Sequence, residues 1–134
     1  MSFGQAVSAF FSNYANFRGR TRRSGYWWAA LFLVIASLVL WFVDLQLFSG
    51  MWPQELLDQG SGPLSIVFGL AIIIPVLSLG VRRLHDTGRS GWWVLLGLIP
   101  LIGSIVLLVF YVQDSQPGEN AYGPNPKEAG ASAV

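Results

Sequence analysis

The sequence predicts an all-α membrane protein with three transmembrane helices and an N-terminal amphipathic helix in the membrane interface. Two observations carry this prediction. Hydrophobic residues make up 53% of the chain and charged residues only 11%, whereas a soluble domain carries about 25% charged residues. The apolar residues are also gathered into three long runs. The 134 residues are expected to form a single membrane domain, residues 1–134.

The first element expected is an amphipathic helix over residues 2–17. Its aromatic and apolar residues recur at spacings of three and four, which places them on one helical stripe. The segment is too short and too polar to span a bilayer, so we expect it to lie along the cytoplasmic face. The alternative is that this helix packs on the protein itself. The stripe consists of Phe3, Val7, Phe10, Phe11, Tyr14 and Phe17.

Three uncharged apolar runs follow, at residues 26–43, 64–81 and 92–112. Each reaches the roughly 18 to 20 residues that are needed to cross about 30 Å of hydrocarbon. Backbone groups in lipid must be satisfied internally, so each run is predicted to be a transmembrane helix. Glycine and proline inside the runs are interpreted as kinks or close helix contacts. They are Gly69, Pro75, Gly97, Pro100 and Gly103.

The charged residues between the runs predict an orientation. Seven of the eight basic residues lie either before the first run or in the connection 82–91. The connection 44–63 carries three acids and no base. Basic segments stay in the cytoplasm, so we expect the N-terminus inside and the C-terminus outside.

The last segment, residues 113–134, is rich in glycine and proline. These residues interrupt regular secondary structure, so we expect turns followed by a frayed terminus over residues 127–134.

A short pattern occurs twice. Arg-Ser-Gly followed by paired aromatic residues opens the first run at residues 23–28 and the third run at residues 89–93. Serine suits the N-cap of a helix, and tryptophan suits the membrane–water interface. The two helix starts could have acquired this pattern independently, because the same physical requirements apply to both. The alternative is that the pattern marks a parallel internal repeat. The predicted interface anchors are Trp27, Trp28, Trp92 and Trp93.

The densest polar chemistry is expected on the cytoplasmic side. Guanidinium groups bind phosphate through two parallel hydrogen bonds, and a basic pocket between helices is a typical site for an anionic lipid. Trp28 and Trp92 could wall such a site by lying over guanidinium faces. The alternative is that the arginines only enforce topology. The candidate residues are Arg18, Arg20, Arg22, Arg23, Arg82, Arg83, His85, Asp86 and Arg89, with the histidine and the aspartate as organisers.

Catalysis is not predicted. His85 beside Asp86 could act as an acid or base, but such a pair is more often structural, and no further catalytic group accompanies it. The chain has no cysteine and one histidine, which excludes a Cys/His zinc site. We therefore expect no metal and no cofactor. The expected partners are membrane lipids with anionic headgroups, with a second copy or another membrane protein as a possibility, and no nucleic acid.

Three groups of residues carry a resemblance to a known family. They are Phe17-Arg18-Gly19-Arg20-x-Arg22-Arg23-Ser24-x-x-Trp27-Trp28, the loop Arg82-Arg83-Leu84-His85-Asp86-x-Gly88-Arg89-Ser90-Gly91-Trp92-Trp93, and the tail Asn120-x-Tyr122-Gly123-Pro124-Asn125-Pro126. Over roughly residues 10–126 the chain resembles the bacterial domain of unknown function 805. The resemblance implies a small protein of the bacterial inner membrane and assigns no activity. It also indicates that both arginine motifs and the tail matter.

Three functions remain open on this evidence. The first is a membrane scaffold or accessory protein that binds anionic lipid through the cytoplasmic arginines. The second is a small oligomeric subunit of a transporter or channel, although no ionisable residue lies inside a predicted span, where ion pathways usually carry one. The third is a membrane-embedded enzyme that uses His85 and Asp86.

Overall fold

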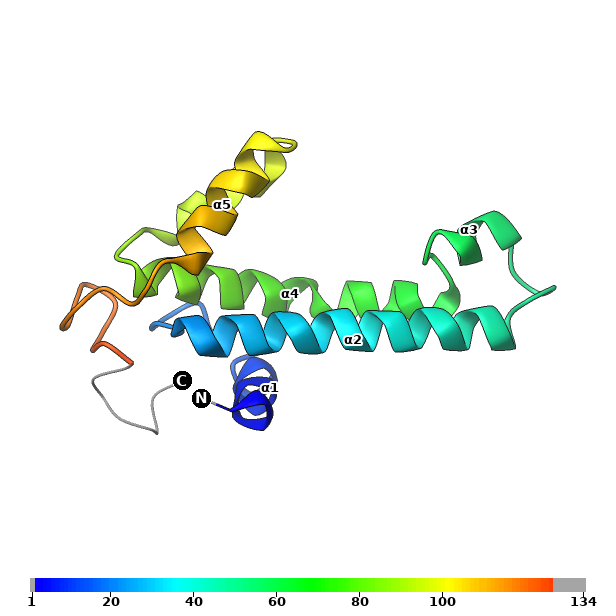
Figure 1. Cartoon of the computed structure of the whole chain (residues 1–134), viewed down its shortest axis with the longest axis horizontal. Coiled ribbons are helices and arrows are strands. Elements are labelled where there is room, and N and C mark those ends of the chain that lie inside the picture. The colour runs from blue at the N-terminus through cyan, green and yellow to red at the C-terminus, as the bar shows by residue number, and fades with distance from the viewer. Residues whose placement is uncertain (1, 127–134) are drawn as a thin grey trace. The chain divides into compact units, whose positions relative to one another are not determined.

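A computed structural model describes residues 2–126, and the regular elements within this range are helices (Figure 1). The chain forms two compact units, one built from residues 30–73 and the other from the two ends of the chain. The elements in order are α1 (Phe3–Ser12), α2 (Arg23–Leu47), α3 (Gln54–Asp58), α4 (Pro63–Asp86), the 3-10 helix η1 (Gly91–Leu98) and α5 (Ile102–Val112). The predicted frayed terminus at 127–134 lies outside the described residues.

Helix α1 begins where a capping box satisfies its first backbone donors. The Ser2 hydroxyl accepts from the Gln5 amide at 3.2 Å, and the Gln5 side chain accepts from the Ser2 amide at 2.9 Å. The helix ends at Asn13, so it is shorter than the predicted 2–17. Ala6 and Phe10 are buried. One side of the helix therefore packs on the protein, as the alternative interpretation expected.

The first two predicted spans form as the long helices α2 and α4. Both exceed the predicted ranges 26–43 and 64–81, and both are long and apolar enough to cross a membrane. Their extra residues lie at the ends of the helices and include most of the charged residues of α2 and α4. The first seven residues of α2 and the last thirteen of α4 belong to the unit made from the chain ends.

In the unit of residues 30–73, a buried carboxylate fixes the start of α4. Asp44 on α2 accepts hydrogen bonds from the Leu64 and Ser65 amides, both at 3.0 Å, and from the Ser65 hydroxyl at 2.8 Å. Amides in the first turn of a helix have no intrahelical partner, so Asp44 acts as a cap supplied by another helix. A Cβ at Gly62 would lie 2.4 Å from the Asp44 carboxylate, so this approach requires glycine.

The third predicted span does not form as one continuous helix. Residues 91–98 form η1, the chain reverses after Ile99, and α5 has only 11 residues. Leu101 takes a positive φ of 64°, which side-chain-bearing residues rarely adopt. At Gly103 a Cβ would lie 1.6 Å from the Leu96 carbonyl oxygen, so glycine lets the two arms meet.

Residues 91–112 therefore make a hairpin whose two ends return to the end of α4, as Figure 1 shows for α5. At its start, a Cβ at Gly91 would lie 2.7 Å from Val81. At its end, the Tyr111 carbonyl accepts from Arg83 at 3.1 Å. The predicted third transmembrane helix is not confirmed, because residues 91–112 form two short helices joined by a reversal and not one continuous helix. Hydropathy registers how apolar the residues are and cannot detect a reversal.

We expect Asp44→Ala to destabilise the protein by about 1–2 kcal/mol, because the first turn of α4 loses its cap. Thermal unfolding of the purified protein in detergent, followed by circular dichroism, measures the loss. Glu55→Ala is the matched control, since Glu55 is an exposed acid in the same unit. Equal melting temperatures for the two variants would contradict the capping role.

Candidate functional site

The most polar part of the protein is a buried cluster at the C-terminal end of α4, which we call the arginine cluster. It consists of Arg20, Arg82, Arg83, Asp86 and Ser115, each at most 8% exposed. Three segments far apart in sequence contribute to it: the linker between α1 and α2, the last turn of α4, and the tail after α5. Burying ionised groups is costly unless each one is paired and hydrogen-bonded.

Asp86 lies at the centre of the arginine cluster. One carboxylate oxygen accepts from Arg20 Nε at 3.0 Å. The other accepts from Arg83 Nη1 at 2.7 Å and from the Ser115 hydroxyl at 2.6 Å. The carboxylate is fully buried and both of its oxygens are bonded. Asp86 therefore joins the linker, α4 and the tail in one place.

Arg83 is fully buried, and its guanidinium group donates hydrogen bonds to three segments of the chain. Besides Asp86, it donates to the Tyr111 carbonyl at 3.1 Å and to the Gln113 carbonyl. Its contact to the Thr21 carbonyl is longer, at 3.4 Å. The end of α5 and the start of the tail are thereby tied to α4.

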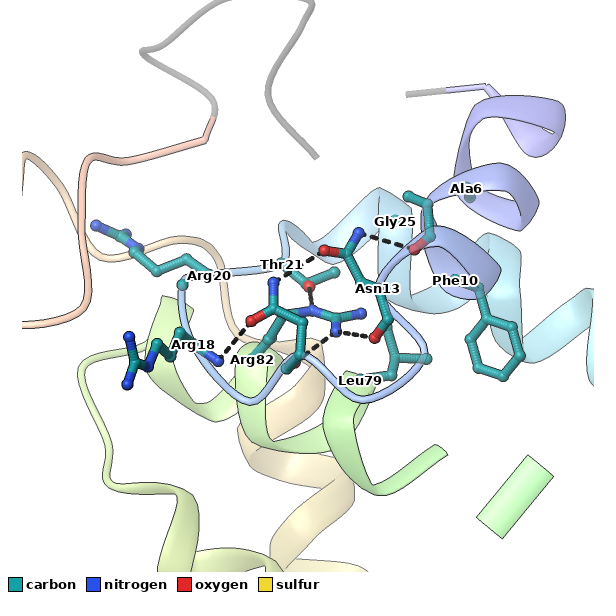
Figure 2. Close-up of a pocket in the computed structure, with 12 residues that line it drawn as sticks. Ala6, Phe10, Asn13, Arg18, Arg20, Thr21, Gly25, Leu79 and Arg82 are labelled. Atoms are coloured by element: carbon teal, nitrogen blue, oxygen red, sulfur yellow. Dashed lines mark hydrogen bonds between the residues drawn. The ribbon is translucent and has the colours of Figure 1, made fainter. Parts of the chain in front are cut away.

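Arg82 forms hydrogen bonds with the N-terminal linker between α1 and α2. Its Nε donates to the Thr21 hydroxyl at 3.1 Å, and its Nη1 donates to the carbonyls of Asn13 and Asn16 at 3.0 and 2.8 Å (Figure 2). The Thr21 amide in turn donates to the Arg82 carbonyl at 3.1 Å. These bonds close the linker after α1 over α4.

A small pocket of about 130 Å³ lies beside Arg82, between α1, the linker and α4. Ala6, Phe10 and Leu79 form its apolar part. The guanidinium group of Arg82 is already held by the linker, and the Arg18 side chain points away in Figure 2. The lining also contains Asn13, Asn16 and Thr21, each of which accepts a hydrogen bond from Arg82.

Arg20 holds the tail. Its Nη1 donates to the carbonyls of Gly118 and Gly123 at 2.9 and 3.2 Å. Its Nη2 donates to the carbonyls of Asp86 and Gln116 at 3.1 and 2.6 Å. The tail segment that the family resemblance singled out is thus folded around one guanidinium group. These contacts place the described part of the tail, residues 113–126, beside Arg20.

The side chains of His85 and Asp86 contact different partners. The His85 ring nitrogen Nδ1 lies 2.9 Å from the Gly19 carbonyl oxygen. The ring stacks on Tyr122 with the centroids 3.9 Å apart. Consecutive residues of a helix point in different directions, so the imidazole faces the linker and the tail while the carboxylate faces the guanidinium groups. The Asn120 side chain donates to the His85 carbonyl at 3.0 Å and fixes the tail further.

The nine residues predicted for a phosphate site therefore divide into two groups. Five are engaged inside the protein: Arg20, Arg82, Arg83, His85 and Asp86. The other four lie nearer the surface. Arg23 donates to the Val112 carbonyl at 3.1 Å. Arg89 donates to the Gln113 side chain at 2.7 Å. For the guanidinium groups of Arg18 and Arg22, the structure gives no hydrogen-bond acceptor among residues 2–126.

The predicted anchors Trp27, Trp28, Trp92 and Trp93 are half-buried or exposed. Trp27 donates from Nε1 to the Tyr111 carbonyl at 3.2 Å. Trp92 is 78% exposed, which leaves its ring outside any packed site. The guanidinium–aromatic contact that forms is a different one: the Arg89 guanidinium carbon lies 4.0 Å from the ring centroid of Phe110.

Of the two predicted serine caps, Ser90 caps η1, whereas the Ser24 hydroxyl is buried without a partner among residues 2–126.

Sequence reasoning missed the groups that satisfy the buried arginines. Most are backbone carbonyls of the linker and tail, and backbone carbonyls carry no residue-type signal. Two side chains of the cluster were also missed: Thr21, which accepts from Arg82, and Ser115, which donates to Asp86. Asn120 and Tyr122 contact His85. The Asn-x-Tyr-Gly tail motif was the one available hint, since it accompanied the arginine motifs in the resemblance.

The two long apolar helices and the buried arginine cluster define a small helical membrane protein. Residues 14–124 match the family described as protein of unknown function, DUF805. The chain is 44% identical to inner membrane protein YhaH of Escherichia coli K12 over 115 residues, which cover 86% of this chain and 90% of that protein. It is 41% identical to inner membrane protein YhaI of the same strain, with 86% and 89% coverage.

The chain belongs to the DUF805 family, which includes small proteins of the bacterial inner membrane. The family resemblance that the arginine motifs and the tail indicated is confirmed. No solved structure matches the chain.

We expect Arg20→Lys to release the tail although it keeps the charge, because an ammonium group cannot replace the guanidinium fork at five acceptors. Cleavage at Glu119 by a glutamate-specific protease should become at least about tenfold faster, since charge-assisted hydrogen bonds contribute about 1.5–3 kcal/mol each. Arg18→Lys, in the same linker and without an acceptor, is the control. Unchanged cleavage in both variants would show that Arg20 does not hold the tail.

Proposed function

We propose that this protein is an accessory or scaffold protein of the inner membrane that binds anionic phospholipid through the surface arginines. The observation that carries the proposal is the division among the arginines. Three guanidinium groups are buried and bonded, whereas those of Arg18 and Arg22 have no acceptor among residues 2–126. Free guanidinium forks beside the first turn of α2 are suited to bind a phosphodiester.

Arg22 adds a second reason. Its Nε is buried without a hydrogen-bond partner, and an unsatisfied buried donor costs about 1–3 kcal/mol. A lipid phosphate against this side chain would offset part of that cost by engaging the same guanidinium group. Arg23 and Arg89 each keep donors that the described residues do not use. The proposed lipid-binding set is therefore Arg18, Arg22, Arg23 and Arg89.

The proposal includes a membrane topology. Helices α2 and α4 cross the bilayer, and the hairpin 91–112 enters it and returns to the same face. The N-terminal segment, the loop 87–90 and the tail 113–126 then share the cytoplasmic side, which agrees with the positive-inside rule. Non-helical backbone at membrane depth is acceptable where protein covers it, and α5 packs on η1 within this hairpin.

Helix α1 completes the cytoplasmic face in this proposal. Phe10 packs on the protein, while Phe3, Phe11, Tyr14 and Phe17 are each about two-fifths exposed. Exposed aromatic rings of this kind prefer the boundary between headgroups and acyl chains. Helix α1 is proposed to lie at that boundary and to bring the neighbouring arginines to the phosphates.

The other two functions have less support. An enzyme based on His85 and Asp86 would need the two side chains to work on one substrate, but they are bonded to different partners. A transporter or channel would need a polar path through the bilayer. The buried charge that the structure gives within α2, Asp44, instead caps α4.

A pair of double variants tests the lipid proposal. Arg18→Gln with Arg22→Gln should lower retention of phosphatidylglycerol by at least about tenfold, because each basic residue near an anionic surface contributes about 1 kcal/mol. Native mass spectrometry of the detergent-solubilised protein measures the retention. Arg18→Lys with Arg22→Lys keeps the charge and removes the fork, so an intermediate loss is expected. Wild-type retention in the glutamine variant would contradict the proposal.

The topology is tested by labelling single cysteines, which the natural chain lacks. Ser2→Cys and Glu119→Cys should react with an impermeant maleimide from the same side of the membrane, and Ser61→Cys from the opposite side. Inside-out and right-side-out vesicles provide the comparison. Reaction of Ser2→Cys and Glu119→Cys from opposite sides would restore the third transmembrane helix and exclude the hairpin.

A further inference from the structure

An apolar groove of about 360 Å³ lies between the end of α4 and η1. Its walls are mostly apolar, and the exposed rings and side chains of η1 form its open edge: Trp92 is 78% exposed and Leu95 is 50% exposed. Two polar side chains interrupt the apolar lining. The groove is lined by Phe17, Val81, His85, Ser90, Gly91, Trp92, Val94 and Leu95.

His85 supplies the unusual chemistry of this groove. The residue is 8% exposed. Its Nδ1 faces the Gly19 carbonyl at 2.9 Å, and a carbonyl can only accept, so Nδ1 carries a hydrogen. In the neutral ring Nε2 is then an acceptor. The structure gives Nε2 no donor among residues 2–126, and a Cβ at Gly91 would lie 3.5 Å from it, which places Nε2 on the groove side of the ring.

Two arginines are sequence neighbours of residues that line the groove. Arg18 follows the lining residue Phe17, and Arg89 precedes the lining residue Ser90. Arg18 has no acceptor among the described residues, and Arg89 uses one Nη for Gln113. The groove therefore combines an apolar trough with a buried hydrogen-bond acceptor, and an arginine adjoins its lining in sequence at two positions. A phospholipid with an anionic phosphodiester and a hydroxyl in its headgroup has the matching features.

We propose that this groove is a binding site for phosphatidylglycerol. An acyl chain lies along Trp92, Val94 and Leu95, and the phosphodiester faces Arg18 and Arg89. A headgroup hydroxyl donates to Nε2 of His85. This inference rests on the proposed function, which requires only that surface arginines bind anionic lipid. It adds a particular lipid and a residue that recognises the lipid's hydroxyl group rather than its charge.

The decisive probe is a pair of lipids with the same phosphodiester charge, of which one carries headgroup hydroxyl groups and the other carries none. Phosphatidylglycerol and phosphatidylmethanol carry the same phosphodiester charge, but phosphatidylmethanol has no headgroup hydroxyl. Native mass spectrometry with the full chain gives the dissociation constant of each lipid. The wild-type protein should bind phosphatidylglycerol about two- to tenfold more tightly, the factor that corresponds to one hydrogen bond of about 0.5–1.5 kcal/mol.

His85→Asn removes this preference while keeping a donor for the Gly19 carbonyl. Its dissociation constant for phosphatidylmethanol should match that of the wild type, and its constant for phosphatidylglycerol should rise to the same value. The melting temperature shows whether the variant folds despite losing the stack on Tyr122. A preference that survives in a folded His85→Asn variant, or that is absent from the wild type, overturns the proposed site.

A second pair of variants on η1 does not depend on the histidine. Leu95→Gln should weaken both lipids by a similar factor, because Leu95 lines the acyl trough. Leu98→Gln is the control, since Leu98 is 79% exposed and does not line the groove. Equal binding by these two variants would place the lipid elsewhere and overturn the groove site. If neither lipid binds the wild-type protein better than phosphatidylcholine does, the proposed function itself fails, which is a distinguishable result.

Discussion

The buried contact between Arg83 and Asp86 sets the conditions that the surrounding chain must meet. Both side chains are fully buried, and their closest atoms are 2.7 Å apart. Removing two charges from water costs several kcal/mol per ion, which is recovered only when the remaining donors and acceptors are also bonded. One aspartate cannot satisfy Arg83 together with Arg20 and Arg82. The linker and the tail must therefore bring backbone carbonyls to the end of α4.

This requirement explains the path of the chain after α4. The acceptors for Arg83 include the carbonyls of Tyr111 and Gln113, and those for Arg20 include the carbonyls of Gly118 and Gly123. The hairpin returns the first two carbonyls to the end of α4, and the folded tail brings the other two to Arg20. The hairpin and the folded tail therefore both supply acceptors to the buried guanidinium groups.

The sequence predicted the helical class and the ranges of α2 and α4 because long apolar runs depend on residue type alone. It missed the hairpin because the deciding features are geometric: a positive φ at Leu101 and the approach of Gly103 to the Leu96 carbonyl. Pro100 and Gly103 are helix-breaking residues in the sequence, but membrane helices also tolerate such residues as kinks, so they did not predict a reversal. The cap made by Asp44 was missed for a related reason, since its acceptor role depends on which helix lies beside it.

The arginine motifs illustrate the same limit at the level of the site. Counting charge put seven equivalent arginines at one face, but neighbours in sequence have different roles: Arg20 is buried and fully bonded, whereas Arg22, two residues later, has no acceptor among residues 2–126. Three buried guanidinium groups and one carboxylate leave a net charge of +2 inside the cluster. Such a charge attracts anions through its field without touching them. In the proposed function this field attracts anionic lipid to the face of the cluster, and the proposed contacts that distinguish one lipid from another are those of Arg18, Arg22, Arg89 and Nε2 of His85.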